Sequence, residues 1–299
     1  MLIDLDGVIY LNEKDNKISG EGCEIIAPFN DKKPLEEIER SIIKTYRKQI
    51  WSKFIKAIKE YELIEDGDKI AVAISGGKDS LLMAKLFQEL YRYGKQNFEL
   101  EFIAMDPGYH PEIRKLLEEN CDYLNIPVEI YDTDVFKVAD RIAGDYPCYM
   151  CARMRRGALY GKAEELGCNK LALGHHFNDV IETTMLNILC NGSIKTMMPK
   201  LKAQNFDNME LIRPLYLIEE EYIKRFIQNS GIWPLNCACM VAAKKIGNKR
   251  FEIKDLIEKL KPSFVNVDIN IFRALENVNM DGIIGWKEDD IKHSFLDDY

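Results

Sequence analysis

The chain lacks any apolar run near the ~20 residues that a membrane-spanning helix needs. Its first ten residues carry acids and no basic segment, so they do not read as a secretory signal, and we expect a cytoplasmic protein with no membrane partner. Internal repeats and low-complexity tracts are also absent. The net charge of −8 argues against a uniformly basic nucleic-acid-coating protein. Of 299 residues, 46% are apolar and 30% charged, which predicts one large or two modest globular domains.

Cysteine is the residue type whose usage needs an explanation. The eight cysteines lie at positions 23, 121, 148, 151, 168, 190, 237 and 239. Disulfides explain them poorly in a chain expected to stay in a reducing compartment. Close spacing instead indicates metal, cluster or sulfur chemistry for the pair Cys148 and Cys151 and for the pair Cys237 and Cys239. The remaining four are each isolated within apolar patterns and are expected to be inert core thiols.

Hydrophobic patterning divides the chain into four parts. We expect an irregular N-terminal appendage over 1–34, a helical segment over 35–66, a nucleotide-binding domain over 67–216, and a mostly helical region over 217–299 that ends in a solvated acidic tail. Residues 35–61 carry apolar side chains at steps of three and four, which predicts one long helix.

The part from 67 to 216 alternates between short apolar runs and helical patterns. Strands are expected at 69–74, 100–105, 128–131 and 171–174, with helices at 79–92, 111–124, 150–166 and 179–190. Such alternation predicts an α/β fold, a Rossmann-like parallel sheet with helices on both faces. Gly76, the segment 106–108 and the segment 174–176 each follow an expected strand, so we expect them to line one pocket at the carboxyl edge of the sheet.

The first chemical motif is the sequence SGGKDS at 75–80, which follows a strand and opens a helix. Two glycines allow backbone N–H groups to point at phosphate oxygens, and the helix N-terminus adds partial positive charge there. The segment matches neither the Walker loop G-x-x-x-x-G-K-[ST] nor G-x-G-x-x-G. It predicts a phosphate site of another kind.

The second motif is GHHFND at 174–179. Two histidines beside an acid can form a zinc site, but adjacent residues point in different directions and rarely reach one metal. Packing or capping histidines are the alternative.

The third motif joins Cys148 and Cys151 to Arg153, Arg155 and Arg156. A C-x-x-C pair alone is compatible with zinc, redox or cluster chemistry. Residues 148–203 hold eight Arg and Lys against four Asp and Glu, a local net charge of +4. Such a patch fits the backbone phosphates of RNA, as does a second basic cluster around 244–250, although a solvated helix face is the alternative. Arg153 and Arg156, three residues apart, are expected to share one helix face.

These motifs together resemble one known family. The segment 75–80 resembles the phosphate loop of the PP-loop ATP pyrophosphatase superfamily, and 174–179 resembles the G-H-H-x-D-D motif of its tRNA-sulfurating members, with Asn178 in place of an acid. The full string C-x-x-C-x-R-x-R-R-G-x-L-Y from Cys148, with MPKL at 198–201 and IRPL at 212–215, resembles the tRNA 2-thiocytidine synthetase family over about residues 36–280.

The resemblance implies an activity and its residues. ATP is split between its α and β phosphates to adenylate the C2 oxygen of a cytidine, at position 32 of the anticodon loop, which sulfur then replaces. Asp79 and Asp179 are implied as catalytic carboxylates that face Mg²⁺, and Cys148 and Cys151 as catalytic cluster ligands. The residues implied to hold ATP are Ser75, Gly76, Gly77, Lys78, Asp79, Ser80, Asp106, Gly174 and His175.

The resemblance also implies the cofactor and the partners. Three cysteines hold a [4Fe–4S] cluster with one open iron, and the third ligand maps to Cys237 in preference to Cys239, although the spacing of this pair is one residue tighter than the family's. Arg153, Arg155 and Arg156 are implied to bind the substrate tRNA. The sulfur donor would be a cysteine desulfurase or free sulfide, and the chain could act as a homodimer.

Two other functions stay open on the sequence. One is an ATP-dependent sulfurtransferase that acts on another tRNA base or on a small heterocycle, for which the Asn178 departure leaves room. The other is a nucleotide-binding iron–sulfur redox sensor without catalysis. Nucleoside analysis separates the first from cytidine thiolation, and ATP turnover with and without RNA excludes the second.

Overall fold

The computed structural model describes residues 2–3, 8–10, 23–26, 31–109, 111–135, 138, 147–237, 249–288 and 291–298. Within these ranges, the side chains of 2–26, 147–152, 236–237 and 298 lie outside the description. The chain forms two compact units: Met1–Asp179 with Met198–Asn248, and Val180–Met197 with Lys249–Tyr299.

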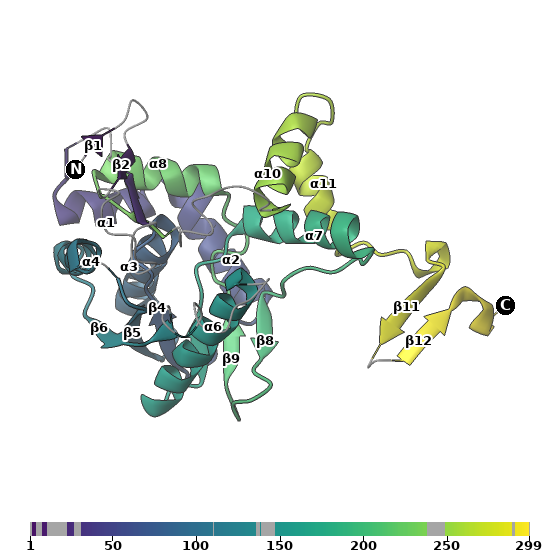
Figure 1. Ribbon diagram of the computed structural model, residues 1–299, viewed down its shortest axis with the longest axis horizontal. Helices are drawn as coiled ribbons and strands as arrows, with labels where there is room; N and C mark the ends of the chain where they lie inside the picture. The colour runs from purple at the N-terminus through teal and green to yellow at the C-terminus, as the bar shows by residue number, and fades with distance from the viewer. Residues whose placement is uncertain are drawn as a thin grey trace. The chain divides into compact units, whose positions relative to one another are not determined.

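The first unit is built on a six-stranded sheet of order β6-β5-β4-β7-β9-β8 (Figure 1). Its parallel strands are β4 (Lys69–Ala73), β5 (Glu99–Asp106), β6 (Val128–Asp132), β7 (Lys170–Ala172) and β9 (Glu210–Ile212). The edge strand β8 (Lys200–Lys202) is antiparallel to β9. The predicted α/β fold with a parallel central sheet is confirmed, while the two short strands β8 and β9 were not foreseen as such.

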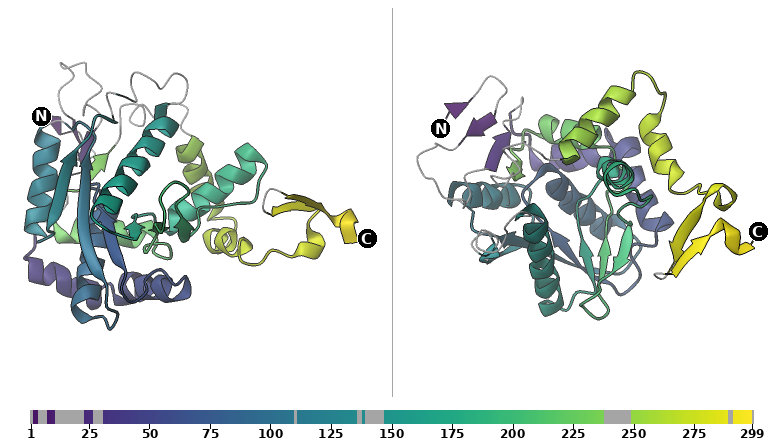
Figure 2. Two further views of the ribbon diagram at one scale, coloured as in Figure 1. Left: turned by 90° about the horizontal axis from the view of Figure 1, so that it is seen from below. Right: turned by 45° about the vertical axis from the view of Figure 1, so that its right-hand side comes forward.

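Helices cover both faces of this sheet, as Figures 1 and 2 show. Ile70 and Val72 of β4 face a core shared with helices α1, α2, α3, α4 and α8, whereas Ala71 and Ala73 face a second core that includes Tyr160 of α6. The bounds of these helices are α1 (Leu35–Ile43), α2 (Ser52–Glu60), α3 (Lys78–Tyr93), α4 (Pro111–Tyr123), α6 (Pro147–Glu165) and α8 (Glu220–Ser230). Because both faces are buried, the strands read as continuous apolar runs in the sequence.

The segment predicted as one helix over 35–61 is interrupted. After α1 the chain turns at residues 44–46, passes through the π-helical η1 (Arg47–Trp51) and continues as α2. Its buried apolar residues Ile38, Ile42, Tyr46, Ile50 and Phe54 recur every four residues, a longer step than the α-helical 3.6. A π turn holds more residues per turn and therefore keeps these side chains on one face.

Strand β10 (Leu235–Cys237) completes a small antiparallel sheet of order β1-β2-β3-β10. The other members come from the N-terminal segment expected to be irregular: β1 (Leu2–Ile3), β2 (Val8–Tyr10) and β3 (Cys23–Ile26). In the register of β3 and β10, Leu235 lies opposite Ile25.

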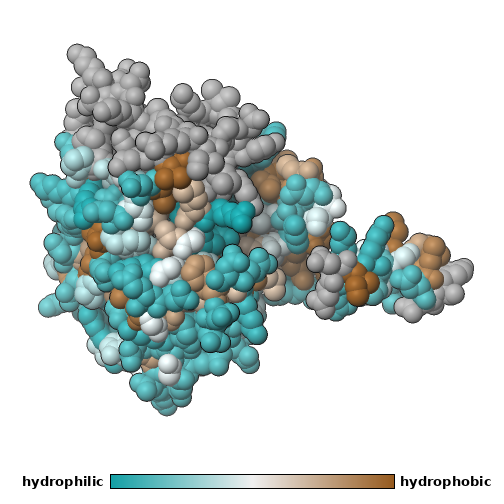
Figure 3. All heavy atoms as spheres, turned by 60° about the horizontal axis from the view of Figure 1, so that its bottom comes forward, coloured by the Kyte–Doolittle hydropathy of each residue, from teal (hydrophilic) through white to brown (hydrophobic). Residues whose placement is uncertain are grey.

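The second unit contains most of α7 (Phe177–Asn191), then α10 (Lys249–Leu260) and α11 (Val267–Ala274). The stretch expected to be a solvated tail instead forms η2 (Met280–Gly282), the hairpin β11 (Gly285–Glu288) with β12 (Ile291–Ser294), and η3 (Phe295–Asp298). Trp286 and His293 stack across this hairpin at 5.0 Å, and exposed apolar side chains are interspersed with polar ones (Figure 3). No helix in the described ranges is both long and apolar enough to cross a membrane.

Candidate functional site

The loop at residues 75–80 joins β4 to the N-terminus of α3. Gly76 in this loop and Gly174 after β7 allow neighbouring segments to pack closely against it. Gly76 has φ +77°, and a Cβ added there would lie 2.6 Å from Cδ1 of Leu235. A Cβ on Gly174, after β7, would lie 3.3 Å from Cβ of Asp79. Side chains at either position would therefore push β10 or the β7 loop away from the start of α3.

Hydroxyl groups hold this loop in shape. Ser80 Oγ donates to the Gly77 carbonyl at 2.9 Å, and the Ser75 N–H donates to Ser80 Oγ at 3.2 Å. Gly77 is the N-cap of the 16-residue helix α3. Free backbone N–H groups and the positive end of the helix dipole therefore meet here, which is the arrangement that binds phosphate.

A cavity of about 390 Å³ opens beside the loop. It brings together the loops after β4 and β7, Met105 of β5 and one side of α6. Of the three loops expected to line one pocket, those after β4 and β7 do so, whereas Gly76 and the segment 106–108 lie outside the lining. Its lining residues are Ala73, Ile74, Ser75, Asp79, Ser80, Met105, Arg155, Arg156, Leu159, Leu173, Gly174, His175 and Asp179.

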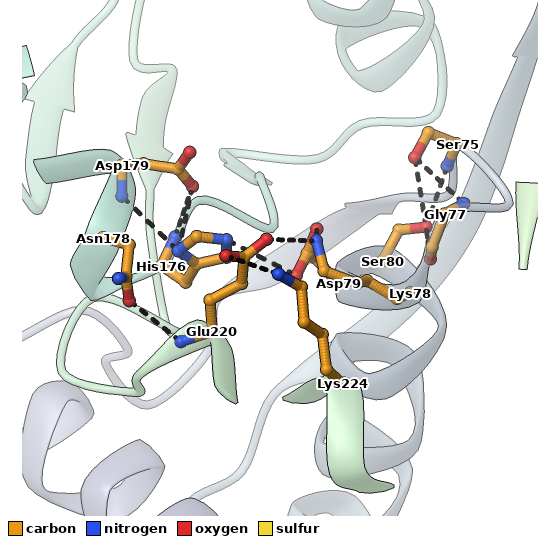
Figure 4. A network of polar contacts seen from close by, with 10 residues as sticks. All are labelled: Ser75, Gly77, Lys78, Asp79, Ser80, His176, Asn178, Asp179, Glu220 and Lys224. Atoms are coloured by element: carbon orange, nitrogen blue, oxygen red, sulfur yellow. Dashed lines mark hydrogen bonds and ion pairs between the residues drawn. The ribbon is translucent and has the colours of Figure 1, made fainter. Parts of the chain in front are cut away.

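Two carboxylates at this cavity flank a buried histidine (Figure 4). His176 is 4% exposed, with Nε2 3.7 Å from Oδ1 of Asp79 and Nδ1 3.4 Å from Oδ2 of Asp179. The backbone N–H of His176 also donates to Oδ2 of Asp179 at 2.8 Å. The neighbouring His175 lines the cavity instead, so the two histidines diverge and do not share one metal.

The donor set of the carboxylates fits Mg²⁺. Oδ1 of Asp79 is buried and accepts no hydrogen bond from any described residue. An orphaned carboxylate oxygen next to a phosphate loop suits a hard cation that takes most of its ligands from phosphate and water. The described side chains contain no group of three or more acidic, histidine or cysteine residues arranged to hold a metal.

Lys78 points out of the cavity towards α8. Its ammonium lies 2.9 Å from Asp79 and 3.3 Å from Glu220, and Glu220 also pairs with Lys224 at 3.0 Å. Burial alone would lower the pKa of Lys78, but the two carboxylates outweigh it and raise this pKa. The implied contact of Lys78 with nucleotide stays a prediction, because the described position of this side chain is a bridge from α3 to α8 (Figure 4).

Asn178, the departure from the family's acidic residue, has a structural role here. Its Oδ1 accepts the N–H of Glu220 at 2.9 Å, at the first residue of α8. The side chain therefore satisfies an unpaired helix N–H, a role that an amide oxygen fills without charge.

The bridge between α3 and α8 can be tested by a pair of adjacent substitutions. Glu220→Gln removes one of two carboxylates from the largely buried ammonium of Lys78 and should lower the free energy of unfolding by about 1–3 kcal/mol. The matched control Glu221→Gln removes only an exposed pair with Arg225 and should cost less than about 0.5 kcal/mol. Urea denaturation measures both, and equal effects would show that the Lys78–Glu220 pair does not hold the helices together.

Asp106 lies at the end of β5 but outside the lining of the cavity. One carboxylate oxygen accepts the N–H groups of Gly108 and Tyr109 at 2.8 and 2.7 Å, and the other accepts from Arg114 at 3.1 Å. These bonds shape its own loop, so contact between Asp106 and nucleotide stays a prediction. Met105 is the β5 residue that lines the cavity, and no sequence signal singled it out.

The helix and the strand that carry three of the candidate cluster cysteines also contribute to the region of the cavity and the phosphate loop. Cys148 and Cys151 lie in the first turns of α6, and Arg155, four residues after Cys151 on the same helix face, lines the cavity. Cys237 ends β10, in which the Leu235 N–H donates to the Gly76 carbonyl at 2.9 Å. The side chains of these three cysteines, and all of Cys239, lie outside the described residues.

The isolated cysteines differ from one another. Burial raises the pKa of Cys121 to about 12 and that of Cys168 to about 11, so both stay protonated and fit the expectation of inert core thiols. Cys190 is exposed, which corrects that expectation for this residue.

The structure separates the three arginines of α6. Arg155 and Arg156 line the cavity, whereas Arg153 is exposed and outside its lining. The expected joint contact of Arg153 and Arg156 with tRNA stays a prediction, whereas the cavity is lined by Arg155 and Arg156. Of the second basic cluster, Lys244 and Lys245 lie outside the described residues, and Arg250 pairs with Glu182 at 3.1 Å.

The amino-acid sequence is similar to that of known proteins. The model of the PP-loop domain family matches residues 37–234. A tRNA-cytidine(32) 2-sulfurtransferase of Geotalea daltonii is 38% identical over 77% of this chain and 92% of its own length. One of Pelobacter propionicus is 37% identical over 75% of this chain and 83% of its own.

A solved structure is similar over much of the fold. The U34-tRNA thiolase NcsA from Methanococcus maripaludis, determined with its [4Fe–4S] cluster, superposes with a TM-score of 0.58 at 25% identity. The match covers 76% of this chain and 79% of that one.

Proposed function

This chain belongs to the PP-loop family and, within it, to the tRNA-cytidine(32) 2-sulfurtransferases, and from that premise we propose that it is an ATP-dependent enzyme that replaces the C2 oxygen of a tRNA cytidine with sulfur. The observation that carries the proposal is the single cavity at which the phosphate loop, Asp79, Asp179 and the helix of Cys148 and Cys151 meet. ATP activation and sulfur transfer need these groups within reach of one base.

The first half of the reaction is adenylation. The cytidine C2 oxygen attacks the α-phosphorus of ATP, the bond to the β-phosphate oxygen breaks, and pyrophosphate leaves. Backbone N–H groups at the start of α3 stabilise the charge on the leaving group. Asp79 and Asp179 would hold Mg²⁺, which when bound supplies further neutralisation of the phosphates.

The second half replaces oxygen by sulfur. A sulfur nucleophile attacks C2, the C–O bond breaks, and AMP leaves with the former base oxygen. Cys148, Cys151 and either Cys237 or Cys239 would hold the cluster, because α6 and β10 each contact or line the phosphate-loop region. When bound, a [4Fe–4S] cluster with three thiolate ligands keeps one iron free to carry the sulfur. A cysteine desulfurase or free sulfide would provide it.

The RNA would approach from the side of α6. Arg155 and Arg156 line the cavity there, and the surrounding sequence 148–203 carries a net charge of +4 within a chain of −8. Phosphate contacts of this kind position a strand without reading its sequence. An anticodon-loop base is unstacked at lower cost than a paired base and can enter the cavity.

Mass spectrometry of tRNA nucleosides tests the function. Cells without this protein should lose 2-thiocytidine and keep their other thiolated nucleosides, and the intact gene should restore it. Loss of a different thionucleoside would instead support another target base. ATP turnover that tRNA does not stimulate, with every thionucleoside retained, would support a sensor and contradict the enzyme.

A further inference from the structure

The segment 40–59 is rich in cations and contains no acid. It covers the end of α1, all of η1 and most of α2. Its seven cations are Arg40, Lys44, Arg47, Lys48, Lys53, Lys56 and Lys59. A local charge of +7 therefore lies in a chain whose net charge is −8. We call the first four of these residues, Arg40, Lys44, Arg47 and Lys48, the cationic surface.

Neighbouring acids leave the cationic surface without neutralising partners. All four of its side chains are exposed, and none forms an ion pair with a carboxylate of the described residues. Two acids that precede it on α1 bind other cations. Glu37 lies 2.6 Å from Lys33, and Glu39 lies 2.5 Å from Lys85 and 3.0 Å from Arg92. The charge of the surface is therefore available to an anion from outside the chain.

Two members of the cationic surface line a pocket of about 480 Å³ at the ends of α1 and α8. Its walls include Arg40, Ser41, Lys44 and Thr45 on one side and Asn229 and Ser230 on the other. Asn229 Nδ2 donates to the Tyr46 hydroxyl at 2.6 Å, which joins the two walls. The pair of Lys33 and Glu37 also lines the pocket and adds no net charge. Guanidinium, ammonium and hydroxyl groups are the donors that commonly contact phosphate oxygens of nucleic acids.

Two short paths along the chain connect this pocket to the phosphate loop. Helix α8 begins beside the loop, where Glu220 lies 3.3 Å from Lys78, and its 11 residues end at Ser230 in the pocket wall. Such a helix is roughly 17 Å long. From Ser230 the chain returns to the loop at Leu235, whose N–H donates to the Gly76 carbonyl. Five extended residues also span at most roughly 17 Å, which is about five steps of a nucleic-acid double helix at ~3.4 Å per step.

We propose that the cationic surface binds the phosphate backbone of the paired RNA stem that carries the target loop, with a phosphate at the pocket of Arg40 and Lys44. This inference rests on the function proposed above. An RNA stem fits because its phosphates repeat over the same distance that separates the pocket from the phosphate loop. Contacts of this kind hold the stem without reading its sequence. The arginines at the cavity are left to the unpaired loop.

The test neutralises the two cations that line the pocket. The variant is the full chain with Arg40→Gln and Lys44→Gln. The matched control, Lys115→Gln with Lys259→Gln, changes the net charge equally but removes exposed cations that have carboxylate partners at 3.6 and 2.5 Å. Arg40 and Lys44 also lie at the C-terminal end of α1, where a cation stabilises a helix. Thermal melting of each protein therefore accompanies the binding measurements.

Three probes separate the possible anions. One is an RNA stem–loop with the target cytidine in its loop, and the second is the same loop sequence as an unpaired oligonucleotide. The third is a vesicle that contains phosphatidylserine. Affinity for each RNA is measured over a series of salt concentrations, and affinity for ATP is measured on the same proteins.

The pocket variant should bind the stem–loop about tenfold more weakly, and the slope of log affinity against log salt should flatten by roughly 1.4–1.8, which corresponds to two lost phosphate contacts. Its affinities for the unpaired oligonucleotide and for ATP should stay within about twofold of the wild type, because neither reaches the stem site. The control should bind the stem–loop like the wild type. In thiolation assays the variant should raise the KM for the stem–loop and keep kcat.

Four results would overturn the inference. Unchanged stem–loop affinity with a lower melting temperature would make the two cations stabilisers of α1. Equal losses for the stem–loop and the oligonucleotide would place the contact at the loop, and equal losses in variant and control would show a general effect of net charge. Loss of vesicle binding alone would assign the surface to a membrane. A wild type that binds the stem–loop but forms no 2-thiocytidine would instead contradict the proposed function, so the two failures are distinguishable.

Discussion

Asp79→Asn should lower the rate of AMP and pyrophosphate formation by about 10²- to 10³-fold, the scale found when one preorganised charge-stabilising group is lost from an active site. The substitution keeps the shape of the side chain and removes the charge of a carboxylate whose Oδ1 is buried and accepts no hydrogen bond from the described residues. Loss of that charge removes the candidate Mg²⁺ ligand at the start of α3. Chromatography of the adenine nucleotides, with an assay for pyrophosphate, measures the rate.

The fold should survive this change. The loss includes about 0.3–1 kcal/mol from the helix dipole and the pair with Lys78 at 2.9 Å, so the free energy of unfolding should fall by about 1–3 kcal/mol, as for Glu220→Gln. The control Asp122→Asn removes an exposed acid of α4 and should leave the rate unchanged. Release of ADP and phosphate by the wild type, or full activity of Asp79→Asn, would contradict the assigned chemistry.

Cys148→Ala and Cys151→Ala should each remove nearly all iron from protein purified without oxygen. The wild type should be brown and contain about four irons and four sulfides per chain. The two residues are one turn apart at the start of α6, so one cluster can take both thiolates, and loss of either leaves too few ligands. Iron and sulfide analysis with the visible absorption spectrum measures the content.

The buried thiols provide matched controls. Cys121→Ala and Cys168→Ala should keep the iron, because burial holds these groups as protonated thiols away from the cavity lining. Of Cys237→Ala and Cys239→Ala, only one should lose the cluster. If both do, four protein ligands leave no open iron, and the proposed sulfur delivery fails. Zinc in place of iron would have the same consequence.

The sequence predicts best where one local pattern decides the structure. Strand β4 and helix α3 were foreseen because an apolar run, two glycines and a helical pattern follow one another without ambiguity. Strands β8 and β9 have three residues each, and β8 is partly exposed at the sheet edge, so neither has enough length to show a period. The pairing of β9 with β7 and of β8 with β9 is set by tertiary contacts.

The helical segment at 35–61 shows how a correct pattern can still mislead. Apolar residues at steps of three and four indicate an α-helix. Side chains placed strictly at every fourth residue, however, shift around the axis of an α-helix by about 40° from one to the next. Over Ile38, Ile42, Tyr46 and Ile50 this drift is too large for one buried face. The π turn removes it, and a strict test of the period would have indicated the break.

The sequence predicted the motifs that form the candidate site but not the hydrogen bonds and ion pairs that these motifs make with distant residues. The loop at 75–80, Gly174, His175 and Asp179 converge as the strand ends require. The role of Asn178 as a cap for α8 and the outward direction of Lys78 depend on Glu220, 42 or more positions away in the chain.

The hydrogen bond from Leu235 to Gly76 has a consequence for biosynthesis. It joins residues about 160 positions apart, which a ribosome working at 5–20 residues per second makes roughly 8–30 seconds apart. During that interval the nascent chain has its phosphate loop but not β9, α8 or β10. The sheet edge formed by β9 and the candidate thiolates of Cys237 and Cys239 are therefore still missing at that stage. Loading of the proposed cluster with all three thiolates would accordingly require synthesis through β10.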